Sequence, residues 1–379
     1  MNADESKIHA GTDGERTVSR LRFRTWSDSR RIYQSKIKPN SKQESILQIG
    51  VFMGAQAQIN REIQQEAPKK FFLTREELEE FHTRGFLGPY DLMPADEIKA
   101  LWKRMRLELF DRSKAIYPNA QPGTGIYDYD RHLDNSILAD IICRPQIVHR
   151  MASILGPDVL CWRTEFFPKY AGDEGTDWHQ VDTFGGADGI PHIQWPNGSD
   201  FGGAMTAWIA FTDASEDRSC MQFMPGTQRT MYFDESKGMH YDPKKANRHE
   251  INGVLRGFFG YDWREIQKDP DWVPDESQAV SKPCRAGQFL IFPTTLMHAS
   301  TPHAGKTDEM RLAVAARYVP TSVVLYGNMK ETNIVYELGG SYSLDNYGAI
   351  LVSGRNDYTH NRIRTHTTRG VKFVNCDPR

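Results

Sequence analysis

Five short stretches decide the fold of this 379-residue chain: VLCWRTEFF at 159–167, AMTAWIAFT at 204–212, CMQFMPG at 220–226, QFLIFP at 288–293 and RLAVAARYV at 311–319. Each is rich in Phe, Val, Ile, Leu or Trp, and Gly, Pro and Asp occur between them, which is typical of β-strands. Several short strands in series favour an antiparallel sandwich or barrel. The sequence therefore predicts a mostly β core from residue 159 onward.

The segment before these strands carries helix signals. Thr74 and Glu77 fit a capping box, in which each side chain satisfies a free amide of the other residue. The helix that they open should end near Gly85. A second helix is predicted to start at Pro94 and to run through IKALWKRMRLELF, and a third over residues 134–155. We expect these helices to form a layer that supports the β-core, with the C-terminal residues wrapping back.

Charge and cysteine usage exclude several classes of protein. The 47 basic and 49 acidic residues give a net charge of −2, so no global positive field exists to hold nucleic acid or an anionic membrane. No stretch reaches the ~18 apolar residues of a membrane span. The 5 cysteines are odd in number and form no CxxC pair, which favours free thiols over a zinc ribbon or a disulfide framework. We expect a soluble, cytoplasmic protein.

The composition predicts two parts, a polar extension over residues 1–69 and one domain over residues 70–379. Between residues 16 and 38 there are eight basic residues and one acidic residue, Asp28. We interpret this part as a solvated, partly disordered arm, followed by a short helix around 44–63. A mitochondrial presequence is the alternative, and the acidic start of the chain argues against it.

Two histidines stand out by their context. His179 lies in TDWHQVD, where a strand should begin, and His298 lies in LIFPTTLMHAS, at the end of an apolar strand. An imidazole there is costly unless something binds it, although for each histidine taken alone core packing is the more common explanation. Arg311 opens the next strand and shares a face with Arg317 by period-2 alternation. A histidine followed by such an arginine suits a metal next to a carboxylate clamp, and a structural ion pair is the alternative for Arg311.

Longer stretches make a resemblance specific. They are YDRHLD, ILGPDVLCWRTEFFPKYAGDEGTDWHQ, FMPGTQ, RGFFGYD, AGQFLIF, TLMHAS, RYVP and THTTRG. From about Phe71 to the C-terminus the chain resembles the phytanoyl-CoA dioxygenase-like branch of the Fe(II)/2-oxoglutarate enzymes, and more narrowly the syringomycin-type threonine halogenases. The fold that this resemblance implies is a double-stranded β-helix, a cupin-like jelly roll, with an N-terminal helical layer.

The resemblance also implies roles for individual residues. His179 and His298 would be the iron ligands, and Arg311 would pair with the distal carboxylate of 2-oxoglutarate, with Thr176 and Trp208 beside it. Arg317 would lie next to the coordination position where these enzymes hold chloride. The residues expected to line the substrate approach are Glu165, Phe167, Thr206 and Phe259. Ordinary core packing is the alternative for the aromatic residues among them.

Position 181 decides the expected reaction. Most Fe(II)/2-oxoglutarate enzymes supply two ligands from HxD or HxE, because residues i and i+2 of a strand share a face. Here that residue is Val181, which has no lone pair, while Asp182 should point to the opposite face and act structurally. In the halogenases that the chain resembles, Ala or Gly stands at this position and chloride takes the place of the carboxylate. Valine adds two methyl groups there, and Gly186 replaces an Asn.

The implied activity is chlorination of an unactivated carbon on an aminoacyl group that a peptidyl carrier protein holds, with Fe(II), 2-oxoglutarate, O2 and chloride. Such enzymes serve nonribosomal peptide and antibiotic biosynthesis. Two alternatives stay open. A hydroxylase or desaturase would place water in the position of the carboxylate, and a non-catalytic binding protein could use a degenerate oxygenase fold.

Overall fold

The computed structural model describes residues 71–120, 125–197, 199, 203–242, 249–251, 253–327 and 334–377. The predicted N-terminal extension over 1–69 and the helix around 44–63 lie outside these residues. None of the described helices is both long and apolar enough to cross a membrane. The five cysteines are free thiols, and all except Cys376 are buried.

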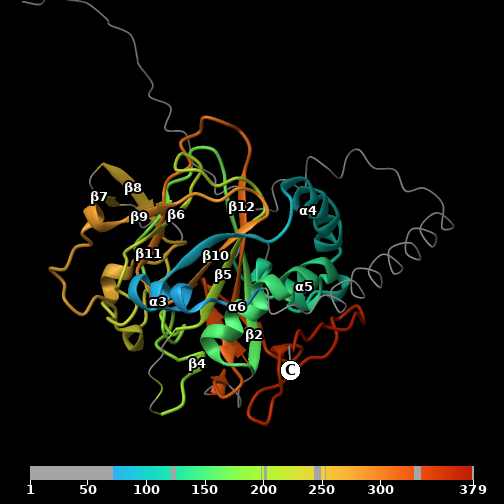
Figure 1. Cartoon of the computed structure of the whole chain (residues 1–379). Helices are drawn as coiled ribbons and strands as arrows, with labels where there is room; N and C mark the ends of the chain where they lie inside the picture. Colours follow the sequence, from blue (N-terminus) through green and yellow to red (C-terminus); the bar gives the residue numbers. More distant parts are fainter. Residues whose placement is uncertain are drawn as a thin grey trace, which may run out of the picture. The chain divides into compact units, whose positions relative to one another are not determined.

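One six-stranded antiparallel sheet forms the centre of the described domain (Figure 1). In spatial order its strands are β1 (Leu87–Asp91), β10 (Gln288–Pro293), β5 (Met205–Ala210), β12 (Arg311–Pro320), β2 (Val159–Lys169) and β16 (Ile350–Ser353). Four of the five predicted strand stretches are in this sheet, and the fifth forms β6. These strands are almost continuously buried, which explains why they are apolar runs rather than alternating patterns.

Smaller sheets complete the β-structure. They are β11 (His298–Ser300), β6 (Met221–Phe223) and β9 (Val280–Lys282); β3 (Gly175–Thr176), β8 (Val254–Gly257) and β7 (His249–Ile251); β4 (Ile193–Gln194) and β13 (Val324–Leu325); and β14 (Ile334–Glu337) and β15 (Gly340–Ser343). A core cluster joins Trp208 and Leu290 of the large sheet to Phe223 of β6. The described sheets do not close into a barrel, and this mostly β arrangement is consistent with a cupin-like jelly roll.

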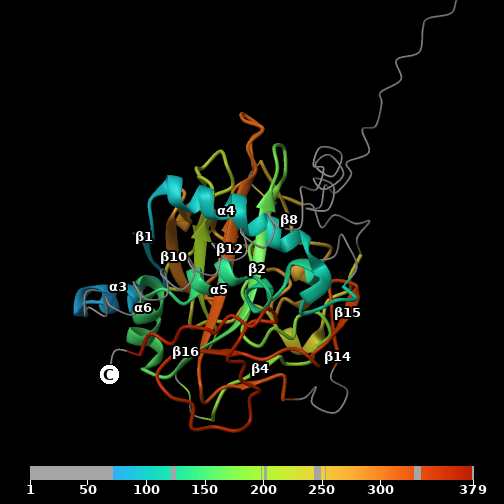
Figure 2. The same cartoon turned by 90° about the vertical axis from the view of Figure 1, so that its right-hand side faces the viewer.

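The helices precede most of the sheet in sequence. They are α3 (Arg75–Arg84), α4 (Ala95–Phe110), α5 (Ser136–Ile142) and α6 (Pro145–Leu155), with short 3-10 turns at Arg112–Lys114, Gly125–Asp128, Arg131–Leu133, Glu235–Lys237, Trp263–Ile266 and Glu276–Gln278. Figure 2 shows α4 and α5 in front of β12 and β2. Trp102 of α4 lies 6.1 Å, ring to ring, from Phe166 of β2, and α6 contacts β2, β12 and β16.

The predicted first helix is confirmed in detail. The Thr74 amide donates to the Glu77 carboxylate at 2.8 Å, and the Glu77 amide donates to the Thr74 hydroxyl at 3.2 Å. Gly85 ends the helix with φ of 85°, a left-handed conformation that suits glycine. The second predicted helix is also present: α4 begins at Ala95, one residue after the predicted start, and Pro94 occupies the N-cap position without a side-chain hydrogen bond.

Three sequence-based expectations were wrong in detail. The helix predicted over 134–155 is two helices, because Pro145 disfavours helical backbone at the residue before it and starts a new helix. His298 does not end the preceding strand: β10 ends at Pro293, a turn follows, and His298 begins β11. No strand begins at His179, which forms an isolated bridge with His298. The C-terminal residues do return to the core, where β16 pairs with β2.

Candidate active site

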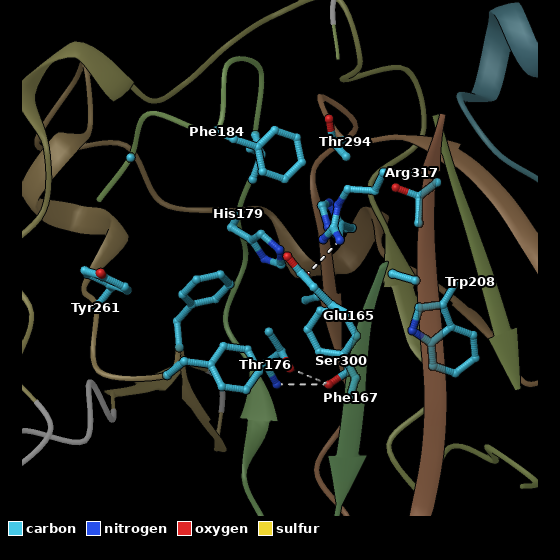
Figure 3. Close-up of a pocket in the computed structure, with 18 of the residues that line it drawn as sticks. Glu165, Phe167, Thr176, His179, Phe184, Trp208, Tyr261, Thr294, Ser300 and Arg317 are labelled. Atoms are coloured by element: carbon cyan, nitrogen blue, oxygen red, sulfur yellow. Dashed lines mark hydrogen bonds and ion pairs between the residues drawn. The ribbon is translucent and has the colours of Figure 1, made fainter. Parts of the chain in front are cut away.

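His179 and His298 face each other across two segments that are far apart in sequence. The amide of each donates to the carbonyl of the other at 3.1 Å, and their ring centroids are 4.0 Å apart. This pairing is possible because His298 opens β11 directly after the turn that follows β10. Figure 3 shows His179 in the pocket with the other site residues around it.

The hydrogen bonds of the two imidazoles set their tautomers. Nδ1 of His179 lies 2.8 Å from the carbonyl of Asp177, and Nδ1 of His298 lies 2.7 Å from the carbonyl of Leu296. A carbonyl can only accept, so each Nδ1 carries the proton and each Nε2 keeps its lone pair. Burial lowers the pKa of His298 to about 4 and holds the pKa of His179 well below its ordinary value. Both rings are therefore neutral near pH 7, which is the form that binds a metal ion.

No carboxylate joins this pair. Val181 stands two residues after His179, and its amide donates to the carbonyl of Thr294 at 2.8 Å. Asp182 accepts the amide of Gly203 at 3.1 Å and does not line the pocket. Within the described ranges, no group of three or more His, Cys, Asp and Glu side chains is arranged to hold a metal ion. The donor set thus fits a metal with two protein ligands and several positions left for small molecules.

Arg311 is a buried cation that pairs with no carboxylate of the described residues. Its Nη1 donates to the carbonyl of Phe167 at 2.8 Å and its Nη2 to the hydroxyl of Ser219 at 3.1 Å, while its Nε has no hydrogen-bond partner among the described residues. Burial lowers its pKa to about 10, so the guanidinium remains charged near pH 7. The structural ion pair that the sequence left open for Arg311 is not formed within the described part of the chain. An anion is the partner that this arrangement lacks.

The surroundings of Arg311 suit a small dicarboxylate. Its guanidinium lies 5.3 Å from the ring centroid of Trp208. The Ser300 hydroxyl donates to the Thr176 hydroxyl at 3.1 Å and accepts the Thr176 amide at 3.0 Å, as the dashed lines of Figure 3 show. All four residues line the same pocket as the histidine pair. Thr176 and Trp208 thus line the same pocket as Arg311, and their roles at the co-substrate stay predictions.

Arg317 lines the same pocket as the histidines and is paired with Glu165. Its Nη1 is 2.8 Å from Glu165 Oε2 (Figure 3), because β12 and β2 are neighbours in the sheet. Its Nε has no hydrogen-bond partner among the described residues. The phenyl ring of Phe184 covers the guanidinium, with 5.1 Å between them.

Two threonine hydroxyls lie in the same wall of the pocket. Thr206 is the cross-strand neighbour of Arg317, and Thr294 is joined to Val181 through its carbonyl. Both hydroxyls are buried, and neither has a hydrogen-bond partner among the described residues. Thr206 was expected from the sequence. Thr294 was missed, although its position in FPTTLMHAS, just before His298, was a usable signal.

The remaining predicted residues lie at the approach to this centre. The rings of Phe167 and Phe259 are 6.0 Å apart, and Phe259 is 42% exposed with φ of 44°, a left-handed conformation that is unusual for an aromatic residue. Together with Glu165 and Thr206 they line the pocket. Pocket residues that the sequence analysis did not single out include Phe184, Glu235, Met239, Tyr261, Trp263, Ser300 and Glu337.

Comparisons with known proteins identify a family and similar solved structures. The phytanoyl-CoA dioxygenase (PhyH) family matches residues 81–313 of the chain. The structure of CytC3 with Fe(II) and alpha-ketoglutarate is 38% identical, covers 82% of this chain and 99% of its own, and superposes with a TM-score of 0.64. A second CytC3 structure is 41% identical, covers 80% of this chain and 97% of its own, and has a TM-score of 0.63. No curated protein sequence matches the chain.

Proposed function

The chain belongs to the phytanoyl-CoA dioxygenase family, and we propose that it is a non-haem halogenase that chlorinates an unactivated carbon of an aminoacyl group tethered to a peptidyl carrier protein. It is an oxygenase-type enzyme that depends on Fe(II) and 2-oxoglutarate. The observation that carries the halogenase assignment is Val181, which supplies no ligand atom at the position where the superfamily has a carboxylate. We further assign the sheets to a double-stranded β-helix.

In this proposal His179 and His298 hold the iron through Nε2. The carbonyls of Asp177 and Leu296 keep both rings in the required tautomer and orientation. Arg311 binds the distal carboxylate of 2-oxoglutarate, with Thr176, Ser300 and Trp208 around it. When bound, iron, 2-oxoglutarate and O2 supply the oxidant that removes a hydrogen atom from the substrate carbon.

The wall next to Val181 offers donors to an anion. The hydroxyls of Thr206 and Thr294 and the Nε of Arg317 are buried without partners among the described residues. Buried donors in this state are costly, and a halide would compensate them. The Glu165 carboxylate neutralises Arg317 only in part, since it also lies 3.6 Å from Arg163. This donor set supports chloride as the small ligand beside the iron.

A tethered substrate is supported by the aromatic residues that line the pocket and by the resemblance to the syringomycin-type halogenases. Phe259 is partly exposed and its ring lies 6.0 Å from that of Phe167, so aromatic rings border a route from the surface to the pocket of the histidine pair. Such a route suits an acyl group on a flexible arm, which extends inward while the carrier protein stays outside.

Hydroxylation is the second candidate, and the side chain of Val181 favours it. Val181 packs against the cluster that contains Met239 and Trp263, so its two methyl groups take up room near the iron position. Water is smaller than chloride and fits a reduced space. A non-catalytic binding protein is not retained, because the family assignment and the similarity to the CytC3 structures indicate an enzyme.

The test is a reaction with Fe(II), 2-oxoglutarate, O2, excess chloride and a carrier protein loaded with each of several amino acids, followed by mass spectrometry of the acyl group. A chlorinated product is expected, and none in the His298→Ala variant. Hydroxylated product alone, with labelled oxygen incorporated at high chloride, would contradict the halogenase and support the second candidate.

A further inference from the structure

A buried carboxylate, Glu235, borders the pocket with one of its oxygens unused. Its side chain comes from the short 3-10 turn Glu235–Lys237 and is only 7% exposed. Oε2 accepts the amides of Asp182 and Thr183 at 3.1 and 2.6 Å and the Thr183 hydroxyl at 2.7 Å. Oε1 is buried and has no hydrogen-bond partner among the described residues.

The unused oxygen faces the space above Gly186. A Cβ atom placed on Gly186 would lie 3.9 Å from Glu235 Oε1, 3.7 Å from Cη2 of Trp263 and 3.1 Å from Cε of Met239. Gly186 does not adopt the left-handed conformation that requires glycine. The glycine is therefore not required by the backbone conformation, and its lack of a side chain leaves room in the pocket. We call the region bounded by Gly186, Glu235, Met239 and Trp263 the side arm.

The side arm adjoins the metal centre. Trp263 lies 5.6 Å, ring to ring, from His179, and Val181 packs against the cluster that contains Met239 and Trp263. A small group bound in the side arm would therefore lie close to the carbon that reacts.

Glu235 differs from the other glutamates of the pocket in its charge balance. Glu165 is paired with Arg317, and Glu337 is 3.3 Å from Arg163. Glu235 forms no ion pair within the described residues, and burial raises its pKa to about 7. A carboxylate in this condition lacks a cation, and a bound cation would favour its charged form.

We propose that the side arm binds the free ammonium group of the aminoacyl substrate, with Glu235 Oε1 as its partner. This assignment rests on the proposed function, since it takes the substrate to be an aminoacyl group. A bound ammonium would supply the hydrogen bond and the positive charge that Glu235 lacks. It would also fix the amino acid at a second point besides its tether, so that one carbon is presented to the metal centre.

The test uses stable amides of pantetheine in two matched series, alanyl with propionyl and leucyl with 4-methylpentanoyl, so that each pair differs by the amino group. Binding to the protein loaded anaerobically with Fe(II) and 2-oxoglutarate is measured by calorimetry. The wild type should bind the amino member of each pair about 10- to 100-fold more tightly. Glu235→Gln should remove this preference and leave propionyl binding unchanged, because it neutralises one side of a buried charge pair.

Two further variants separate folding from recognition. Gly186→Ala places a methyl group in the side arm and should also abolish the preference, with Met239 moving slightly to admit it. Asp234→Asn removes the same charge one residue away, on a partly exposed side chain that does not line the pocket, and should keep the preference. The assignment would be overturned if the wild type bound the members with and without the amino group equally, or if Glu235→Gln kept the preference for the amino member. Either result would leave the proposed chlorination intact. If neither series binds the wild type, the carrier-tethered substrate and this assignment are both wrong.

Discussion

Two buried polar regions border the same pocket and differ in how their polar atoms are partnered. Around Arg163, Nη2 donates to the hydroxyls of Tyr326 and Tyr342 at 2.8 and 2.7 Å, and Nη1 pairs with Glu337, so that only Nε lacks a partner among the described residues. Around the histidine pair, by contrast, several buried donors have no partner in the described chain. They include the hydroxyls of Thr206 and Thr294 and the Nε atoms of Arg311 and Arg317.

This difference indicates that the Arg163 region stabilises the fold and that the histidine region binds ligands. A buried polar group that protein atoms satisfy contributes to stability, whereas an unpartnered one costs about 1–3 kcal/mol. A fold retains such a cost where a ligand compensates it. The Arg163 region therefore holds β14 and β15 against the large sheet, and the histidine region is where iron, 2-oxoglutarate and a small anion are expected.

The largest effect is expected when one of the two histidines is removed, which tests whether the histidine region binds iron. His179→Ala or His298→Ala removes one of the two proposed protein ligands, so iron affinity should fall by more than ~100-fold. Mutating residues that only hydrogen-bond to a metal ligand already lowers metal affinity by ~10–100-fold. The visible band of the anaerobic complex with Fe(II) and 2-oxoglutarate should disappear. His240→Ala, on an exposed histidine, should retain it. A variant that keeps the band would remove its histidine from the proposed site.

The next effect concerns the unpaired cation. Arg311→Ala should weaken 2-oxoglutarate binding by ~2–5 kcal/mol, or about 30- to 5,000-fold, because the co-substrate carboxylate would be buried without its partner. Arg311→Lys should recover only part of the loss, since an ammonium cannot form two parallel hydrogen bonds. Calorimetry with anaerobic Fe(II) protein measures both. Equal affinity in the wild type and the Ala variant would show that Arg311 does not bind the co-substrate.

Substitutions at position 181 test whether the unpartnered donors of Thr206, Thr294 and Arg317 hold an anion. Val181→Asp would place a carboxylate next to His179 and should weaken chloride by about tenfold or more, because two like charges would compete for one place. Val181→Ala removes two methyl groups and should strengthen chloride binding by a smaller factor. Chloride titration of the anaerobic visible spectrum gives the affinities. If all three proteins bind chloride equally, Val181 does not face the metal.

The smallest effect belongs to the supporting region. Tyr342→Phe removes one acceptor of Arg163 and should lower the free energy of unfolding by about 1–2 kcal/mol, since hydrogen bonds to charged groups contribute more than neutral ones. Affinities for 2-oxoglutarate and chloride should not change. Tyr336→Phe, on the same hairpin but 60% exposed, is the matched control and should have almost no effect on unfolding. A loss of co-substrate binding in Tyr342→Phe would mean that the two regions are not separate.

Much of the architecture was predictable because it depends on local sequence. The five apolar stretches became strands, and Thr74 with Glu77 formed the expected capping box. The pocket contains every predicted site residue. For Arg311 and Arg317 the reason is local, because period-2 alternation places both on one face of β12. Their roles as ligands and clamps stay predictions. The break at Pro145 was also readable in the sequence and was overlooked.

Other features had no local signal. Nothing near Glu235 in sequence indicates that its carboxylate meets the space above Gly186, and nothing near Arg163 indicates its tyrosine partners on β15 and after β13. These contacts join segments 49 or more residues apart, whose relative position depends on the packing of whole sheets. Burial then decides which polar atoms keep a partner.

The sequence by itself determined the strand-forming stretches, the helix caps and the absence of a carboxylate at position 181, since these depend on side-chain type and short-range periodicity. Only the tertiary structure decided that His179 and His298 meet with their Nε2 lone pairs available, that Arg311 is buried without a counter-ion in the described chain, and that Glu235 keeps one oxygen unused. These outcomes depend on which distant backbone and side-chain groups are brought within hydrogen-bond distance, and that is a property of the packed fold.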